Sequence, residues 1–299
     1  MNRRTFITST AAAALVGCST ESKPDIIDTH THFYDPSRPQ GVPWPNKKSK
    51  IIYRTVLPPE FMQMTKPFGV TGTVVVEASP WLEDNQWLLD LAEKETSIVG
   101  IVGNVDPTIE DFNKHISRFA KNKLFRGIRL KKSTYMTDSP EIIKGFKTLA
   151  DLDLSVDLNG GVKVLEASTK ISQKVPELRQ VIDHLPINVR KGEEAQYDEF
   201  IKKASRNPNV SIKVSNVIRK VNGETVTDPE YYHKTLDELW DIFGPDRVIF
   251  GSNWPVSDRV GTYEELFNIV DSYVKSRGQE DINKYYSLNA KKYYKWIKR

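Results

Sequence analysis

The sequence has a single cysteine, Cys18, and only five histidines among its 299 residues. One cysteine near the N-terminus excludes a disulfide framework. A domain that begins after it has neither a cysteine nucleophile nor a thiolate metal site. Any catalysis or metal binding therefore depends on histidine, carboxylate, amide and cationic side chains.

The sequence also lacks a strong excess of charge. The formal net charge is +4, and loss of residues 1–17 lowers it by two because Arg3 and Arg4 leave with no acidic residue. Nucleic-acid-binding domains carry a clustered basic face, so we expect no nucleic-acid partner. The lysine-rich end, 284–299, alternates with Tyr, Trp and Ile and predicts a terminal amphipathic helix with a basic outer face. A small molecule is the expected partner, and the oligomeric state stays open.

The first 22 residues resemble an export signal followed by a short tether. Arg3 and Arg4 precede an apolar run, 11–16, as in bacterial twin-arginine signals. This run is far shorter than the roughly 20 residues that span a bilayer. The segment 15–18, Leu-Val-Gly-Cys, resembles a lipoprotein processing box that would make Cys18 the lipidated first residue; the alternative is a simple export signal with a coincidental cysteine. We expect a periplasmic or cell-envelope lipoprotein that touches the membrane only through the lipid on Cys18.

Residues 23–299 show a regular alternation of strand and helix patterns. Short runs rich in β-branched residues predict strands at 25–31, 73–79, 98–104, 125–131, 154–158, 179–185, 209–215 and 246–252. Segments with charged faces predict helices at 83–95, 110–122, 138–151, 162–175, 193–206, 229–243 and 262–276. Eight such units over about 250 residues are typical of a (β/α)8 TIM barrel in one α/β domain. A doubly wound open sheet is the alternative, but its usual Gly-rich loop does not follow the first strand.

Two connections are candidates for substrate specificity. The loop 33–72 is long and contains Tyr34, Trp44 and four early prolines, and long loops in compact domains are often functional. Its composition predicts an ordered lid over the barrel mouth. The second candidate is the loop at 216–228.

His30 and His32 lie at the end of the first predicted strand. Side chains two apart on a strand point the same way, so the two imidazoles are expected to converge. Imidazole is a common metal ligand and general base near neutral pH. Taken alone, the pair could also be a coincidence of two core or surface histidines. His115 and His233, in predicted helical regions, are weaker candidates.

Polar residues occur at the ends of most other predicted strands, which is where barrel active sites lie. Charges inside apolar strands are costly unless paired or metal-bound. Arg129 and Lys213 could therefore simply neutralise Glu77 and Asp157. Asn104 is the weaker candidate on the third strand. The remaining set of inward-facing strand-end residues is Glu77, Arg129, Asp157, His184, Lys213 and Asn253.

Three of these segments resemble the amidohydrolase-related family, and most closely its sugar-lactone hydrolase branch. They are Asp28-Thr29-His30-Thr31-His32-Phe33, Asp183-His184 and 250–256 (Phe-Gly-Ser-Asn-Trp-Pro-Val). Gly127-Ile128-Arg129 and 209–215 fit the same branch, which includes L-fuconolactonase and 2-pyrone-4,6-dicarboxylate lactonase. The resemblance implies a (β/α)8 hydrolase with its site at the strand ends.

Many members of the family bind one divalent metal and some lactonases bind none, so the resemblance implies either possibility for this chain. For this chain the ligands would be His30, His32, His184 and Glu77, with zinc or manganese as the ion. One position departs from the family pattern, because the last strand usually ends in Gly-Ser-Asp-Trp-Pro and this chain has Asn253. A carboxamide orients water or substrate but does not accept a proton from water.

These observations predict water attack on a lactone or similar cyclic ester. The nucleophile would come from His184 acting as base, or from a water on a metal at the ligands named above. Asn253 would position the water, and Asp157 would be a substitute base. Arg129 and Lys213 would bind a carboxylate or the developing oxyanion, and Trp254 and Tyr34 would contact the substrate. Two alternatives remain: a catalytically retired surface lipoprotein that binds sugar acids, and a metal-dependent decarboxylase.

Overall fold

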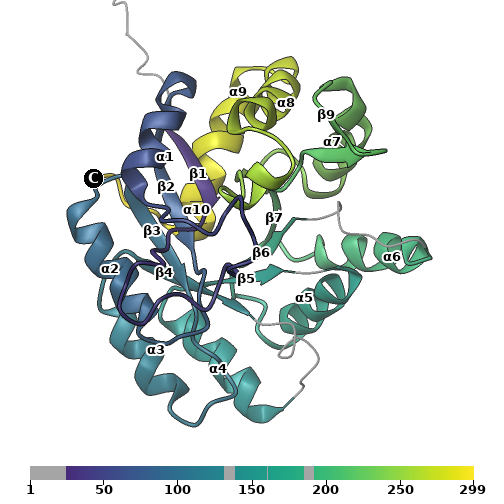
Figure 1. Ribbon diagram of the computed structural model, residues 1–299. Coiled ribbons are helices and arrows are strands. Elements are labelled where there is room, and N and C mark those ends of the chain that lie inside the picture. The colour runs from purple at the N-terminus through teal and green to yellow at the C-terminus, as the bar shows by residue number, and fades with distance from the viewer. Residues whose placement is uncertain (1–24, 131–138, 160, 185–191) are drawn as a thin grey trace, which may run out of the picture.

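The computed structural model describes residues 25–130, 139–159, 161–184 and 192–299, and the predicted signal at 1–22 with Cys18 lies outside them. Eight parallel strands follow one another around a barrel, as Figure 1 shows. They are β1 (Ile26–Thr31), β2 (Val70–Val76), β3 (Ile98–Gly103), β4 (Phe125–Leu130), β5 (Ser155–Asn159), β6 (Gln180–Asp183), β7 (Val210–Val214) and β10 (Val248–Phe250).

The barrel closes where β1 meets the end of β10. The His32 amide donates to the carbonyl of Trp254 at 2.9 Å, and the Asn253 amide donates to the carbonyl of His30 at 2.8 Å. Asp28 reinforces this seam, because its carboxylate accepts the amides of His30 and Ser252 at 3.0 and 2.9 Å. The predicted (β/α)8 TIM barrel is therefore confirmed, and the doubly wound alternative is wrong.

Amphipathic helices cover the outside of the barrel. Thr262 and Glu265 form a capping box that starts α8, whose inner face buries Phe267 and Val270 against the sheet. The helices are α1 (Pro58–Thr65), α2 (Asp84–Lys94), α3 (Phe112–Ala120), α4 (Pro140–Asp151), α5 (Val162–Lys174), α6 (Glu194–Ala204), α7 (Glu230–Phe243) and α8 (Tyr263–Ser276), with a short turn η1 (Lys66–Phe68) after α1. Every predicted helix in the described residues has its counterpart.

The chain end differs from the single amphipathic helix that the sequence predicts. It consists of α9 (Gln279–Asn283), a π-helical turn η4 (Lys284–Leu288) and α10 (Asn289–Tyr294), followed by five non-helical residues. Lys291 and Lys292 do form an exposed basic face. Tyr293 and Tyr294 are fully buried because they close one end of the barrel rather than lie on its surface.

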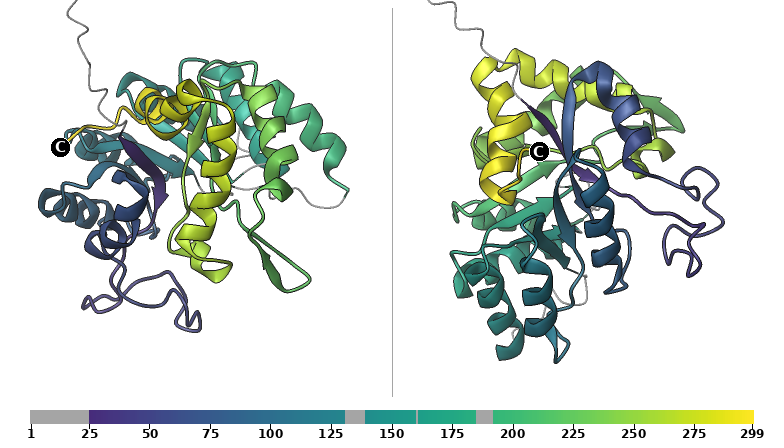
Figure 2. Two further views of the ribbon diagram at one scale, coloured as in Figure 1. Left: turned by 90° about the horizontal axis from the view of Figure 1, so that it is seen from above. Right: turned by 90° about the vertical axis from the view of Figure 1, so that its left-hand side faces the viewer.

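Two loop segments protrude at the opposite end of the barrel. Both views in Figure 2 show one of them, the loop after β1. The loop after β1 is ordered, and the predicted loop 216–228 contains a small antiparallel hairpin, β8 (Arg219–Val221) and β9 (Glu224–Val226). The yellow C-terminal segment lies at the other end. No helix in the described residues is long and apolar enough to cross a membrane.

Candidate active site

Three histidines converge at the end of the barrel from which the long loop protrudes. The rings of His30 and His32 at the end of β1 have centroids 5.0 Å apart. The ring of His184, which follows β6, lies 4.5 Å from that of His30. All three side chains are at most 6 % exposed. The convergence predicted for the strand-one pair is therefore present, with His184 as a third member.

The backbone at two strand ends is strained in a way that shapes this cluster. His184 has φ of +63° and Asn253 has φ of +66°, a left-handed conformation that is uncommon for non-glycine residues. Consecutive residues of a regular strand point to opposite faces. The turn at His184 breaks that alternation, so both Asp183 and His184 face the site. Such strain is often found at functional positions.

A fully buried charge network lies directly beneath the histidines. Lys213 Nζ is 3.0 Å from Asp157 Oδ2 and 2.9 Å from Asp183 Oδ1, and all three side chains are inaccessible to solvent. The same ammonium is 3.4 Å from His30 Nδ1. Two carboxylates face one ammonium here, so an ionised network has an excess of negative charge that a cation at the histidines would balance.

Burial keeps the imidazoles neutral. Desolvation is the main cause that lowers the pKa of His184 to about 4 and that of His32 to about 3. Desolvation also holds the pKa of His30 well below its ordinary value, although Asp183 opposes this. Neutral imidazoles have a lone pair for a metal or a proton.

The tautomer of His32 follows from its partners. Nδ1 lies 2.9 Å from the carbonyl oxygen of Val76, an acceptor, so Nδ1 carries the proton and Nε2 the lone pair. Oδ1 of Asn253, also an acceptor, is placed 3.3 Å from Nε2. Because two acceptors do not bond, the amide orientation that presents Nδ2 to His32 is favoured.

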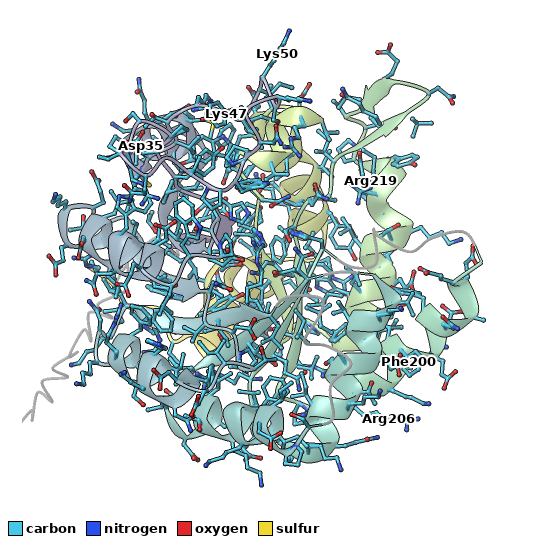
Figure 3. The ribbon with its side chains drawn as sticks, turned by 60° about the horizontal axis from the view of Figure 1, so that its bottom comes forward. Asp35, Lys47, Lys50, Phe200, Arg206 and Arg219 are labelled. Atoms are coloured by element: carbon cyan, nitrogen blue, oxygen red, sulfur yellow. The ribbon has the colours of Figure 1, made fainter. Side chains whose placement is uncertain are left out.

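A cavity of about 490 Å³ opens above these groups. The lid prediction for the loop after β1 is supported by Trp44, which lines the cavity and packs against His32 with ring centroids 5.6 Å apart. Lys50 of the same loop points away from the molecule (Figure 3). The described lining residues are His32, Trp44, Glu77, Ala78, Pro80, Asn104, Arg129, Asn159, His184, Asn253, Val256 and Arg259.

Arg129 and Glu77 line this cavity as an ion pair. The guanidinium donates to Glu77 Oε1 through Nε and to the Glu77 carbonyl through Nη2, both at 2.9 Å. The ion pairs considered from the sequence, Arg129 with Glu77 and Lys213 with Asp157, are thus both present. Glu77 was also expected as a metal ligand, but its carboxylate engages Arg129 instead.

The donor set that fits a divalent metal is His30, Asp183 and His184. One ligand atom from each lies within 4.8 Å of the others. His30 Nε2 and Asp183 Oδ2 are buried with no hydrogen-bond partner among the described residues, whereas Asp183 Oδ1 is paired with Lys213. Two imidazoles and a carboxylate are ligands that zinc accepts at open catalytic sites. Asp183 was missed as a ligand because the adjacent His184 was taken as the residue that ends this strand, although Asp183 lies in register beside the inward-facing Lys213.

Four residues expected at the substrate lie elsewhere. Asp157 and Lys213 are buried in the network below the cavity and do not line it, so Asp157 is poorly placed as a base for water in the cavity. Trp254 is fully buried against Phe61. Tyr34 is 3 % exposed, and its hydroxyl donates to a loop carbonyl. Deep burial in aromatic packing separates these last two from the cavity.

Three lining residues carry little or no signal in the sequence. Asn159 lies two positions after Asp157 on β5, so it shares the inward face and is nearer the mouth. Asn104 was the weaker candidate on the third strand and lines the cavity. Arg259 follows the last strand within a short helical turn, which no motif marked. None of the described lining residues comes from the β8–β9 hairpin, and His233 pairs with Glu230 on α7 instead.

Known proteins share this architecture. The model of the amidohydrolase family matches residues 27–296. The L-fucono-1,5-lactonase of Burkholderia ambifaria is 29 % identical over 243 residues, which cover 79 % of this chain and 82 % of that protein. A zinc-bound amidohydrolase of Burkholderia multivorans superposes with a TM-score of 0.78 at 20 % identity, covering 91 % of this chain and all of that one. A probable 2-pyrone-4,6-dicarboxylic acid hydrolase of Acinetobacter baumannii gives a TM-score of 0.69 at 18 % identity, with 91 % and 100 % covered.

The barrel has three histidines at its mouth, and the family model matches almost its whole length. These two findings place the protein in a class of hydrolases. The chain belongs to the amidohydrolase family. The family resemblance drawn from the strand-end motifs is confirmed, and the related lactonase and pyrone hydrolase lie in the branch it named.

Proposed function

We propose that the protein hydrolyses a sugar lactone or a similar cyclic ester at the C-terminal mouth of the barrel. The observation that carries the proposal is the meeting of His30, Asp183 and His184 beneath a polar cavity of about 490 Å³. Three carboxamides line that cavity, and amides suit the hydroxyl groups of a sugar. The similarity to an L-fucono-1,5-lactonase supports this substrate class.

His184 is the group proposed to move the proton. Its ring lines the cavity, and its Nδ1 is 2.7 Å from Ser215 Oγ, which fixes the ring. With its pKa lowered to about 4, the imidazole is uncharged and accepts the proton as water attacks the lactone carbonyl. Asp183 beside it stabilises the resulting imidazolium. His184 then returns the proton to the ring oxygen as the ester bond breaks, which yields the hydroxy acid.

Arg129 and Asn253 complete the proposed chemistry. The guanidinium of Arg129 faces the cavity and is suited to the oxyanion that forms on the carbonyl oxygen. Asn253, held at 3.3 Å from His32, orients the water without taking its proton. In a metal-bound form, His184 would be a ligand rather than the base: a zinc or manganese ion held by His30, Asp183 and His184 would supply Lewis-acid chemistry, which lowers the pKa of bound water from about 15.7 to about 7.

The test uses the purified domain, its metal content and a panel of aldonolactones. We expect turnover, and we expect His184→Gln to lower kcat/KM by about 10²- to 10⁴-fold. His233→Gln is the matched control, because His233 pairs with Glu230 on the surface of α7. Absence of turnover on every lactone and ester by a correctly folded protein would refute the proposal.

A second candidate function rests on Asn253. An amide at the strand end where the family pattern has an aspartate is compatible with a protein that binds sugar acids without hydrolysing them. Tight binding of an aldonic acid by a protein that turns over no lactone would favour it.

We also propose that residues 1–22 direct export through the twin-arginine route and that Cys18 is lipidated. The support is the pair Arg3–Arg4, the short apolar run and the cysteine box. This placement makes the protein a cell-envelope lipoprotein.

A further inference from the structure

A tyrosine from the end of the chain contacts the charge network beneath the active site. The Tyr294 hydroxyl donates to Asp157 Oδ2 at 2.7 Å. The same oxygen accepts the ammonium of Lys213 at 3.0 Å, and Lys213 reaches Asp183 and His30. A continuous chain of contacts therefore joins the closed end of the barrel to two of the three residues that fit a metal.

The backbone holds Tyr294 firmly in this place. Its carbonyl accepts the Nε–H of Arg126 at 2.9 Å, and the amide of Ile297 just beyond donates to the carbonyl of Val99 at 2.9 Å. The ring is fully buried, and Lys213 Nζ lies 5.0 Å from its centroid. The yellow segment that carries Tyr294 lies at the end of the barrel away from the long loop (Figure 2).

Asp157 depends on this hydroxyl for its position. Oδ2 has two donors, Tyr294 and Lys213, whereas Oδ1 is buried with no hydrogen-bond partner among the described residues. Without the hydroxyl, Lys213 would be the sole donor to a buried carboxylate. The carboxylate would then be free to shift and to draw the ammonium with it, because no other donor in the described part of the chain bonds Asp157.

We propose that Tyr294 is a positioning residue that acts through Asp157 and Lys213 to hold His30 and Asp183 in their active arrangement. The C-terminal segment thus completes the active site from the opposite end of the barrel. The kinetic part of this inference rests on the proposed lactonase function, and the structural part does not.

The test compares Tyr294→Phe with Tyr293→Phe. The two tyrosines are adjacent and fully buried, and each hydroxyl makes one hydrogen bond of similar length, but that of Tyr293 goes to the carbonyl of Pro208 at 2.8 Å. Both variants should lose a few degrees of thermal stability. Only Tyr294→Phe should shift the imidazole NMR signals of His30, and only this variant should lower kcat on a lactone about tenfold with KM unchanged.

Asp157→Asn provides the second arm. If Tyr294 acts through Asp157, adding Tyr294→Phe to Asp157→Asn should move the His30 signals and kcat little further. Equal effects of the two tyrosine variants on His30, or full additivity with Asp157→Asn, would overturn the inference. A protein that hydrolyses no lactone but shows the selective His30 shift would refute the proposed function and retain the positioning role.

Discussion

Asn253 places an amide, rather than a carboxylate, beside His32 at the end of the last barrel strand. In a working hydrolase, Asn253→Asp should change kcat by less than about tenfold, because the proposed base is His184. Asn253→Leu removes the hydrogen bonds that orient water and should lower kcat by about 10- to 100-fold. Steady-state kinetics on one lactone measures both. An inert wild type that gains activity only as Asn253→Asp would favour the binding function.

The carboxyl of Asp258 is expected to make the stability of the fold depend on pH. Burial is the main cause that raises the pKa of this carboxyl from 3.8 to about 6, while Arg54 at 3.7 Å opposes it. A raised pKa means that the folded protein binds the proton more tightly than the unfolded chain, so stability is lost as the pH rises from about 4 through 6.

Asp258→Asn should therefore stabilise the protein at pH 7.5 and change little at pH 4. Because the side chain is 25 % exposed, we expect only about 1–2 kcal/mol at the higher pH. Denaturant unfolding at the two pH values measures the difference. Equal effects at both pH values would contradict the raised pKa.

At the scale of elements, the end of β10 passes unusually close to β1. A Cβ on Gly251 would lie 2.8 Å from His30 Cβ and 3.1 Å from Lys213 Cδ. Gly251→Ala should therefore cost about 1–3 kcal/mol of stability and should also reduce activity, because His30 must move. Urea unfolding and lactone kinetics measure the two effects.

Gly145→Ala in α4 is the matched control. Its Cβ would first meet Phe112 Cε1 at 3.2 Å, in the outer helical layer away from the site. We expect it to leave activity unchanged. If Gly251→Ala were as active as this control, the close approach of β10 to His30 would have no catalytic consequence.

At the scale of the whole molecule, we expect the barrel to fold without its predicted signal. The described structure begins at residue 25, and β1 at Ile26 starts the barrel. Deletion of residues 1–22 should leave the thermal midpoint and lactone turnover unchanged. Full-length protein should appear in the membrane fraction of a bacterial host and incorporate labelled fatty acid, and Cys18→Ser should abolish the labelling. A soluble, unlabelled full-length protein would refute the lipoprotein proposal.

The alternation of strand and helix patterns was enough to predict the barrel, because each pattern is local. Each of the eight strands and seven helices predicted in the described residues has its counterpart, with ends shifted by a few residues. The histidine pair and the Asp183-His184 motif likewise located the site, since strands of a barrel present their C-terminal ends at one mouth.

Only the tertiary structure decided which side chains meet the cavity. Strand parity turns Asp183 inward and would turn His184 outward, but the left-handed backbone at His184 brings its ring inward as well. The sequence marked Asp157 and Lys213 as site residues, yet their depth in the barrel puts them below the cavity. Tyr294 was predicted on a surface helix, and it lies under the site because the chain end folds across the barrel. The local sequence pattern determines which segments form strands and which side chains of a strand share a face. The depth of a side chain in the barrel and its long-range contacts depend on how distant segments pack.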